Sequence, residues 1–337
     1  MTAPRPGSLV AYAVLGATSW GVTIASLLAA NGHDVTILTR TDAEASGVSA
    51  LRGLARIPEL SLPSRVSAMA ASEANAAFDG LVVAVPAQTV RANAAALGAF
   101  HGVPVLSAAK GIELGTGLRV SQVLAAGGWP EAKVAVLSGP NLAHEVARGL
   151  PAAAVVAAGA ESEAERWQAA LSGPMFRVYR SADVVGVELG GALKNVIAIA
   201  AGVAAGLDMG ANAMAAIMTR GLAEMTRLGV ALGADPLTFQ GLAGVGDLAV
   251  TCYSPLSRNH RFGELLARGE SPATAAALIG EAVEGAATAP VALALAKRLG
   301  VDMPIAGQVV AVLDGSASIH QAMQALLGRA LTIERAG

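Results

Sequence analysis

The chain has 337 residues, of which 54% are hydrophobic, 14% are charged and only 3% are aromatic, and its formal net charge is −2. A nucleic-acid-binding surface requires clustered lysine and arginine, and the sequence has no basic tract that would supply one. A single cysteine, Cys252, excludes an internal disulfide framework and a cysteine-rich metal site, and it favours the reducing cytoplasm. Because so little charge is available to solvate so long a chain, we expect part of the surface to be buried in a homodimer.

An uncharged run from residue 7 to residue 32 could be mistaken for a membrane span or a signal peptide. Gly16 and Gly21 interrupt this run, together with several hydroxyl side chains. Its pattern also changes from a continuous apolar block over Leu9–Leu15 to a helical spacing over Val22–Ala30. The run is therefore predicted to be a buried strand followed by a helix, and no membrane span is expected.

The first half of the chain alternates apolar blocks of strand length with helical segments. Strands are predicted at Leu9–Leu15, Asp34–Thr39, Leu81–Val85, Val103–Ser107, Lys133–Ser138 and Pro151–Ala158, and helices at Ser19–Asn31, Gln88–Phe100 and Leu118–Ala126. Alternation of this kind produces βαβ units. The sequence therefore predicts an α/β fold whose N-terminal part is a Rossmann-type, doubly wound parallel sheet.

The second half of the chain is predicted to be entirely helical. Helices are expected at Val187–Leu207, Gly210–Gly229, Pro236–Gly241, Arg258–Arg268, Ser271–Leu278, Ala286–Leu299 and Ile305–Leu313, with Gly or Pro between them. We therefore expect a dinucleotide-binding domain over residues 1–186 and a helical substrate-binding domain over residues 187–337.

The segment Gly16–Gly21 (GATSWG) joins the first predicted strand to the first predicted helix. In a dinucleotide-binding turn, the first glycine permits the tight turn, the last permits close approach of helix and strand, and amides at the helix N-terminus face a pyrophosphate. Thr18 stands where a middle glycine normally lets the backbone touch the phosphate. A tight β–α turn without a cofactor is the alternative, but the βαβ context favours cofactor binding.

Arg40 follows the second predicted strand, where an NAD-selective site would carry an acidic residue for the ribose hydroxyls. A cation at this position suits the 2′-phosphate of NADPH. Asp42 lies close by in the sequence, so NADH stays an alternative cofactor. Arg40 could also be a solvated strand-end residue without a role in binding.

Lys194 is the only charged residue between Glu188 and Asp208, within a helix of Gly, Ala, Val, Ile and Leu. A lysine in such surroundings is expected to be partly buried, and burial allows its amine to exchange a proton near neutral pH. A lysine whose ammonium extends to the surface is the alternative.

Three further segments are candidates for binding a ligand, and the last of them has the groups that bind an anion. Lys110 and Ser138–Asn141 follow predicted strands and are expected at the carboxyl edge of the sheet, where ligands bind. Ser257, Arg258 and Asn259 open a predicted helix and combine a guanidinium, an amide and helix N-terminal amides. A capped helix with a solvated arginine would give the same pattern. No His or carboxylate pair has metal-ligand spacing, and no metal is expected.

Taken in order, the motifs GATSWG, AVPAQ, KGIE, SGPNLAHEVARGLPAA, ELGGALKNV, GVGDL and SRNHRFG resemble those of the bacterial NAD(P)-dependent sn-glycerol-3-phosphate dehydrogenases. The resemblance runs from about residue 9 to residue 313, and ELGGALKNV and GVGDL with SRN are its most specific parts. It implies reduction of dihydroxyacetone phosphate, a small phosphorylated substrate, to sn-glycerol 3-phosphate for phospholipid synthesis.

The resemblance also implies a role for individual residues. Lys194 matches the family's catalytic lysine, which donates a proton to the ketone oxygen and acts as the base in the reverse direction. Substrate-binding positions are Lys110, Gly139, Asn141, Lys194, Asp247, Ser257, Arg258 and Asn259. Cofactor-binding positions are Gly16, Thr18, Ser19, Trp20, Gly21, Arg40, Lys110, Ala143, Arg258 and Glu284.

Two departures from the family pattern leave alternatives open. One is Thr18, and the other is Asn141, which replaces the usual serine after Ser-Gly-Pro and could alter hydrogen bonding to the glycerol end of the substrate. The alternatives are a related reductase of another small ketone or ketoacid, and a catalytically weakened paralogue that only binds cofactor. Arg258 and its neighbours favour a phosphorylated substrate.

Overall fold

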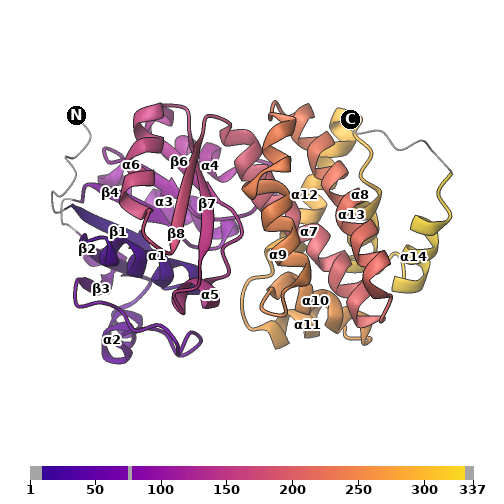
Figure 1. The fold of residues 1–337 in the computed structure, drawn as a ribbon, viewed down its shortest axis with the longest axis horizontal. Helices are drawn as coiled ribbons and strands as arrows, with labels where there is room; N and C mark the ends of the chain where they lie inside the picture. Colours follow the sequence, from indigo (N-terminus) through magenta and orange to yellow (C-terminus); the bar gives the residue numbers. More distant parts are fainter. Residues whose placement is uncertain (1–9, 75–77, 331–337) are drawn as a thin grey trace. The chain divides into compact units, whose positions relative to one another are not determined.

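The computed structural model describes residues 10–74 and 78–330. The chain forms two compact units (Figure 1): Met1–Ala109 with Val120–Val184, and Lys110–Arg119 with Val185–Gly337. The sequence analysis placed a single boundary at residues 186 and 187. In the structure the corresponding division falls between Val184 and Val185. In addition, the segment Lys110–Arg119 packs with the second unit although it lies between two parts of the first in the sequence.

The first unit is built on an eight-stranded sheet with the order β3-β2-β1-β4-β5-β6-β7-β8. Its strands are β1 (Ala11–Leu15), β2 (Asp34–Thr39), β3 (Val66–Ala70), β4 (Gly80–Val83), β5 (Val105–Ser107), β6 (Val134–Ser138), β7 (Ala152–Ala158) and β8 (Phe176–Ser181). The order of the first six strands is that of a Rossmann fold, as predicted. The outermost strands β3 and β8 were not predicted, because exposed residues interrupt both of these edge strands and neither contains a continuous apolar block.

Strand β7 runs antiparallel to β6, with Ser138 opposite Val155, and this pair is the exception to the predicted parallel sheet. The connection between the two strands contains only the short helix α5 (Ala143–Ala147). Five helical residues rise about 7.5 Å, whereas a five-residue strand spans roughly 16 Å. This helix is therefore too short to carry the chain back along the sheet, and β7 starts at the edge where β6 ends.

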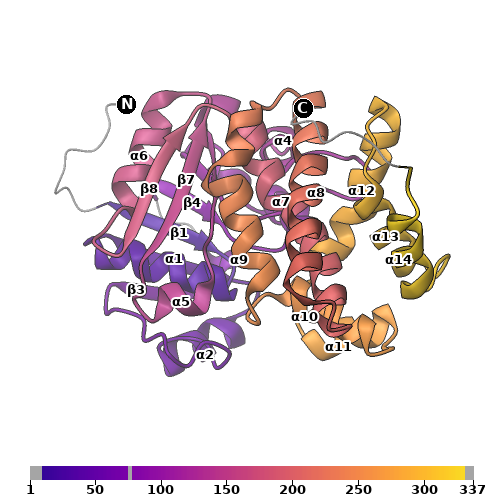
Figure 2. The same ribbon diagram turned by 45° about the vertical axis from the view of Figure 1, so that its right-hand side comes forward.

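Helices cover both faces of this sheet (Figure 2). They are α1 (Ser19–Ala30), α2 (Asp42–Leu51), α3 (Val90–Ala96), α4 (Val120–Ala126), α5 and α6 (Glu161–Leu171). Alternate residues of β1 serve the two faces: Tyr12 and Val14 join the buried cluster that includes α1 and α6, while Ala13 and Leu15 are buried outside that cluster. The predicted helix Gln88–Phe100 is shorter than expected, with separate 3-10 turns on either side of α3.

The second unit is all-helical, as predicted. Its helices are α7 (Val184–Gly206), α8 (Gly210–Ala231), α9 (Asp247–Tyr253), α10 (Arg258–Ala267), α11 (Pro272–Ile279), α12 (Glu284–Leu299), α13 (Pro304–Leu313) and α14 (Ile319–Leu327). Helix α7 forms the centre of the core. By length and hydropathy α7 is the one helix of the described residues that could cross a membrane, and 78% of its apolar window is buried inside the protein. Such burial is typical of a core helix.

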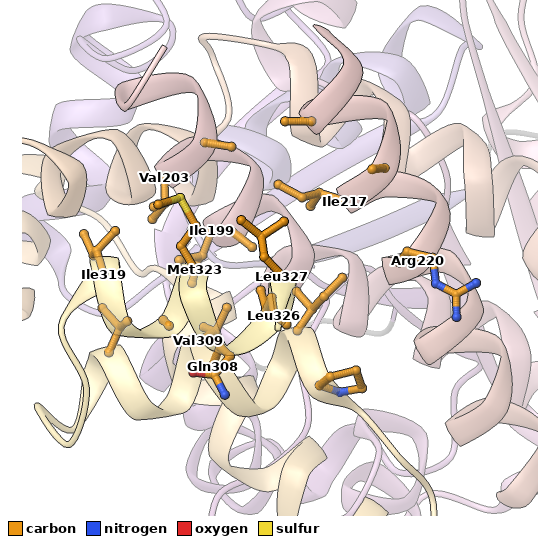
Figure 3. Close-up of a pocket in the computed structure, with 18 of the residues that line it drawn as sticks. Ile199, Val203, Ile217, Arg220, Gln308, Val309, Ile319, Met323, Leu326 and Leu327 are labelled. Carbon is orange, nitrogen blue, oxygen red and sulfur yellow. The ribbon is translucent and has the colours of Figure 1, made fainter. Parts of the chain in front are cut away.

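A cavity of about 1260 Å³ lies within the second unit (Figure 3). Helices α7, α8, α13 and α14 supply most of its lining, which is largely aliphatic and includes Ile199, Ile217 and Leu326. Polar groups are few, among them Arg220 and the buried Glu224, whose carboxylate accepts backbone N–H groups at the start of α13. A sizeable and mostly apolar space therefore lies between these helices.

Helices α7 and α10 approach each other through glycines. A Cβ atom built on Gly202 of α7 would lie 2.0 Å from the carbonyl oxygen of His260, and one on Gly263 of α10 would lie 2.1 Å from that of Ile199. Both contacts are far shorter than a van der Waals separation and involve backbone atoms that cannot rotate away. The abundance of small residues noted in the sequence therefore has a structural cause at this crossing.

We predict that Gly202→Ala or Gly263→Ala lowers the free energy of unfolding by at least about 2 kcal/mol, because the added methyl group forces the two helices apart. Urea denaturation followed by circular dichroism measures the change. Gly307→Ala is the matched control, since Gly307 lies in α13 and its added methyl would meet only Leu293 at 4.0 Å. That control should be neutral or stabilising by up to about 1 kcal/mol. Equal losses in all three variants would contradict the packing explanation.

Candidate active site

The turn between β1 and α1 requires glycine at both of its ends. Gly16 has a φ of +109°, and a Cβ atom there would lie 2.8 Å from Val85 Cγ1. A Cβ atom on Gly21 would lie 2.2 Å from the carbonyl oxygen of Gly16. The first glycine therefore permits the turn and the last permits α1 to start against it, as the glycine pattern predicts.

Thr18 takes a structural part in this turn. It is the N-cap of α1, where its Oγ1 accepts a hydrogen bond from the Gly21 amide at 3.0 Å and donates one to the Ala84 carbonyl oxygen at 2.7 Å. Both interactions draw the hydroxyl toward β4 and into the turn. The departure from the glycine pattern thus replaces conformational freedom with a capped helix start, while the positive end of the α1 dipole stays at this edge of the sheet.

Arg56 is a charged residue at this turn that the sequence analysis missed. Its Nε donates a hydrogen bond to Ser19 Oγ at 3.1 Å, and its Nη2 donates to the carbonyl oxygen of Ala17. The loop that carries it is held to the start of α5 by Glu59, whose carboxylate lies 2.6 Å from His144 Nδ1. No sequence spacing connects an isolated arginine in a loop with a turn almost forty residues earlier, so only the fold reveals it.

Arg40 follows β2 and is strongly exposed, with 86% of its side-chain surface accessible. Its Nε lies 3.5 Å from Glu44 Oε2 in the first turn of α2. An exposed ion pair of this kind contributes little stability and exchanges readily for another anion. The guanidinium is therefore free to bind a ligand phosphate, and the acidic residue that competes for it is Glu44 rather than Asp42.

The remaining candidates of the first unit lie after β6. Gly139 has a φ of +140°, and a Cβ atom there would lie 3.0 Å from the backbone of Ala153 and Ala154. Asn141 donates from Nδ2 to the Ala153 carbonyl oxygen at 2.9 Å. Its Oδ1 is buried without a hydrogen-bond partner. A buried acceptor left open in this way is costly unless something donates to it, and a hydroxyl group of a ligand could do so.

The second unit gathers two lysine side chains around one carboxylate, that of Asp247. Lys194, in the middle of α7, is only 7% exposed, and its Nζ donates to Asp247 Oδ1 at 2.7 Å and to Thr251 Oγ1 at 2.6 Å. Lys110 Nζ donates to the other carboxylate oxygen, Asp247 Oδ2, at 2.6 Å. The burial predicted for Lys194 is thus confirmed, and two lysines far apart in the sequence share one acid.

Local backbone geometry brings Asp247 to Lys194. Asp247 starts α9 directly after a π-helical turn, Leu242–Gly246, and Thr251 follows one helical turn later on the same face. A Cβ atom on Gly190 of α7 would lie 2.3 Å from the Ala243 carbonyl oxygen. The π-helical turn therefore rests on the backbone of α7 where a glycine leaves room. The sequence analysis missed Thr251, although its spacing of four residues from Asp247 was a usable signal.

Burial and charge set the protonation of this cluster. Burial, assisted by repulsion from Lys110, lowers the pKa of Lys194 to about 8 against the opposing pull of Asp247. For Asp247, burial alone raises the pKa, but the two neighbouring ammonium groups outweigh it and the net direction is downward. The cluster therefore holds an ionised carboxylate beside an ammonium group that can release its proton near neutral pH.

Asparagine side chains connect this cluster to two other helix starts. Asn195 donates to the Lys110 carbonyl oxygen at 3.4 Å and accepts at Oδ1 from Asn259 Nδ2 at 2.9 Å. Asn259 Oδ1 in turn accepts from the Gly285 amide at 2.9 Å, next to Glu284 at the start of α12. Asn195 was not among the predicted site residues. The chain of hydrogen bonds fixes Asn259 and the Lys110 backbone relative to α7.

The start of α10 keeps a guanidinium accessible. Ser257 is the N-cap, and its Oγ accepts from the His260 amide at 3.2 Å. Arg258 is the first residue of the helix, and its half-exposed side chain lies 3.5 Å from Glu281 Oε2. The predicted combination of a capped helix and an arginine is therefore present, and the carboxylate of Glu281 competes for the guanidinium.

Each unit thus contains some of the residues predicted to bind the substrate or the cofactor. Gly16, Thr18, Ser19, Trp20, Gly21, Arg40, Gly139, Asn141 and Ala143 belong to the first unit, and Lys110, Lys194, Asp247, Ser257, Arg258, Asn259 and Glu284 belong to the second. Direct hydrogen bonds join Lys110, Asp247 and Lys194. Among the described residues, no group of three or more histidine, cysteine or acidic side chains is arranged to hold a metal ion.

Two family models match the chain. Residues 11–164 match the N-terminus and residues 183–324 the C-terminus of NAD-dependent glycerol-3-phosphate dehydrogenase. A Streptomyces coelicolor protein named glycerol-3-phosphate dehydrogenase (NAD(P)+) is 46% identical over 331 residues, which cover 97% of this chain and 98% of that protein. Another of the same name from Nocardia farcinica is 47% identical over 335 residues, which cover 96% of this chain and 99% of that protein.

Solved structures agree with these relatives. A Coxiella burnetii glycerol-3-phosphate dehydrogenase superposes with a TM-score of 0.87 at 34% identity and covers 95% of this chain and 99% of its own. A probable 2-dehydropantoate 2-reductase from Bacillus subtilis, at 14% identity and a TM-score of 0.57, covers 91% of this chain and 100% of its own and shares the fold alone. The chain belongs to the NAD-dependent glycerol-3-phosphate dehydrogenase family.

Proposed function

We propose that this protein transfers hydride between NAD(P)H and dihydroxyacetone phosphate to give sn-glycerol 3-phosphate, in a reversible reaction. The observation that carries the proposal is the buried Lys194 ammonium on Asp247, because reduction of a ketone needs a proton donor that titrates near neutral pH. Relatives that cover nearly the whole chain are named for this dehydrogenase activity. In the cell the product would enter glycerophospholipid synthesis in the cytoplasm.

In the proposed mechanism, Lys194 donates its proton to the ketone oxygen of the substrate. NAD(P)H supplies the hydride to the carbonyl carbon when it is bound. Asp247 and Thr251 hold the Lys194 amine in one orientation, and Lys110 places a second positive charge beside the developing alkoxide. In the reverse direction, neutral Lys194 removes the proton from the secondary alcohol.

The second domain, residues 187–337, supplies most of the proposed contacts to the substrate. Arg258 binds the phosphate with help from the amides at the start of α10, because a guanidinium and a helix N-terminus both favour an anion. Asn141 Oδ1, buried without a partner, accepts a hydrogen bond from a hydroxyl at the glycerol end. The complete set is Lys110, Gly139, Asn141, Lys194, Asp247, Ser257, Arg258 and Asn259.

The first domain, residues 1–186, holds the cofactor in this proposal. The glycine turn and the α1 amides fit a pyrophosphate, and Arg56 at the same turn adds a positive charge. Arg40 contacts the 2′-phosphate, which favours NADPH over NADH. The remaining cofactor positions are Trp20, Lys110, Ala143, Arg258 and Glu284. The active species is proposed to be a homodimer.

Replacing Lys194 by methionine should lower kcat for dihydroxyacetone phosphate reduction by at least about 100-fold, because it removes the buried amine that donates the proton in the proposed mechanism. The loss of NADPH absorbance with time measures the rate. Lys297→Met is the matched control, since Lys297 is an exposed lysine in α12 of the same unit, and it should retain wild-type activity. Absence of turnover in the wild-type protein would refute the proposed reaction. Full activity of Lys194→Met would refute the proton donor.

The pH dependence follows from the pKa of Lys194, about 8. Reduction needs the protonated amine, so kcat/KM for dihydroxyacetone phosphate should fall as pH rises above about 8, and oxidation of glycerol 3-phosphate should rise over the same range. Asp247 favours the protonated form, so Asp247→Asn should move both transitions to lower pH. A transition that stays in place in Asp247→Asn would contradict the assigned coupling.

Replacing Arg40 and replacing Arg56 should have different effects on the preference between NADPH and NADH. Arg40→Ala should raise KM for NADPH about tenfold and leave KM for NADH unchanged, because only NADPH carries the 2′-phosphate. Arg56→Ala should weaken both cofactors alike, because the pyrophosphate is common to them. Steady-state kinetics of the two variants with each cofactor gives the four KM values. Equal efficiency of the wild-type protein with NADPH and NADH would argue against a selective contact at Arg40.

A further inference from the structure

Lys110 is the first residue of a loop, Lys110–Arg119, that is closed by its own hydrogen bonds. The Glu113 amide donates to the Leu118 carbonyl oxygen at 2.9 Å, and the Gly117 amide donates to that of Glu113 at 3.0 Å. Thr116 Oγ1 donates to the Glu113 carboxylate at 2.5 Å. These bonds, together with the antiparallel bridge between Ile112 and Arg119, hold the two arms of the loop side by side, so Arg119 lies beside the segment that carries Lys110.

The loop is attached to the helical unit at several points. Ile112 is fully buried in the core of that unit. Asn195 of α7 donates to the carbonyl oxygen of Lys110 at 3.4 Å. At the far end of the loop, the Arg119 guanidinium forms an ion pair with the carboxylate of Glu188, which also belongs to α7 and is 7% exposed. The loop therefore lies on the helix that carries Lys194.

The ion pair is buried too deeply to be a solvated surface contact. A carboxylate that is almost wholly buried requires its counter-charge, and removing one partner leaves the other charge uncompensated. Glu188 and Arg119 thus hold the loop end under a strong electrostatic constraint.

We propose that Glu188 is a positioning residue for the reaction: its ion pair with Arg119 holds the loop so that the Lys110 ammonium stays on Asp247 beside Lys194. The inference rests on the proposed function for its catalytic meaning. In physical terms, breaking the ion pair of Arg119 at one end of the loop moves the Lys110 ammonium at the other end away from Asp247.

The charges around Lys194 determine the direction in which its titration shifts. Lys194 faces the charges of Asp247 and Lys110, and it also faces the Cys252 thiol, which stays neutral because burial raises its pKa to about 12. Withdrawal of Lys110 removes repulsion from the Lys194 ammonium and leaves it without a competitor for Asp247. Both changes favour the protonated form of Lys194, so its titration moves to higher pH.

The chain is suited to a direct test because it has only four lysines: Lys110, Lys133, Lys194 and Lys297. In protein labelled with ¹³C at lysine Cε, each lysine gives one NMR signal that shifts when its amine loses a proton. Lys133→Arg and Lys297→Arg assign the two outlying signals. The titration uses the protein without cofactor or substrate, so its outcome is independent of whether dihydroxyacetone phosphate is the substrate.

Glu188→Gln should raise the midpoint of the Lys194 titration by roughly one pH unit, and Lys110→Met should raise it by as much or more. The double variant should match Lys110→Met alone, because the effect of Glu188 passes through Lys110. Arg119→Lys, which keeps the cation, should retain most of the wild-type behaviour. Glu224→Gln is the matched control: it removes another buried carboxylate of the same unit and should leave the midpoint unchanged.

A Lys194 midpoint that is unchanged in Glu188→Gln would overturn the proposal, since a purely structural ion pair lowers stability without altering the titration. A double variant whose midpoint moves beyond that of Lys110→Met would overturn it as well. Circular dichroism verifies that each variant is folded. If Glu188→Gln does not fold, Arg119→Gln breaks the same ion pair by removing its more exposed partner. An unchanged Lys194 midpoint in Arg119→Gln, or a shift beyond that of Lys110→Met when the two substitutions are combined, would then overturn the proposal.

Discussion

A single buried carboxylate, that of Asp247, organises the second unit of this protein. It is 1% exposed and accepts from the ammonium groups of Lys110 and Lys194, one on each oxygen. A charge so deeply buried is tolerated only with close partners of opposite sign. Two ammonium groups on one carboxylate leave a net positive charge, however, and in a buried setting the easiest relief is loss of a proton from Lys194. The same arrangement thus stabilises the carboxylate and leaves Lys194 able to release a proton near neutral pH.

This arrangement depends on helices that approach each other at backbone distance. Gly190 admits the turn before α9, and Gly285 admits the start of α12 against Asn195, where a Cβ atom would lie 2.4 Å from a carbonyl oxygen. Larger side chains would separate these segments and break hydrogen bonds whose donors and acceptors are fixed in position. The low aromatic and high glycine content of the chain is therefore part of how the lysine cluster is assembled. The apolar cavity between α7, α8, α13 and α14 involves none of the residues of that cluster.

The glycine turn of the first unit shows how a departure from a motif can be accommodated. Thr18 gives up the conformational freedom of glycine and gains an N-cap and a bond to Ala84. Arg56 places a guanidinium on the carbonyl of Ala17 and the hydroxyl of Ser19 in the same turn. A helix start with a nearby cation remains suited to a phosphate group even though one glycine is missing.

The sequence by itself determined the Rossmann-type sheet, the helical second half and the burial of Lys194, because apolar periodicity and an isolated charge in an apolar helix report burial directly. Its motifs also identified Lys110 and Asp247 as candidate site residues. Nothing in the sequence indicated that these two side chains are in contact. Only the tertiary structure decided that these two share Lys194 as neighbour and that β7 reverses direction. It alone also revealed the contacts of Arg56 with the glycine turn, of Thr251 with Lys194, of Asn195 with Lys110 and of Glu188 with Arg119. Such pairings join residues many positions apart, and their partners are set by packing distances, which no local pattern of residues encodes.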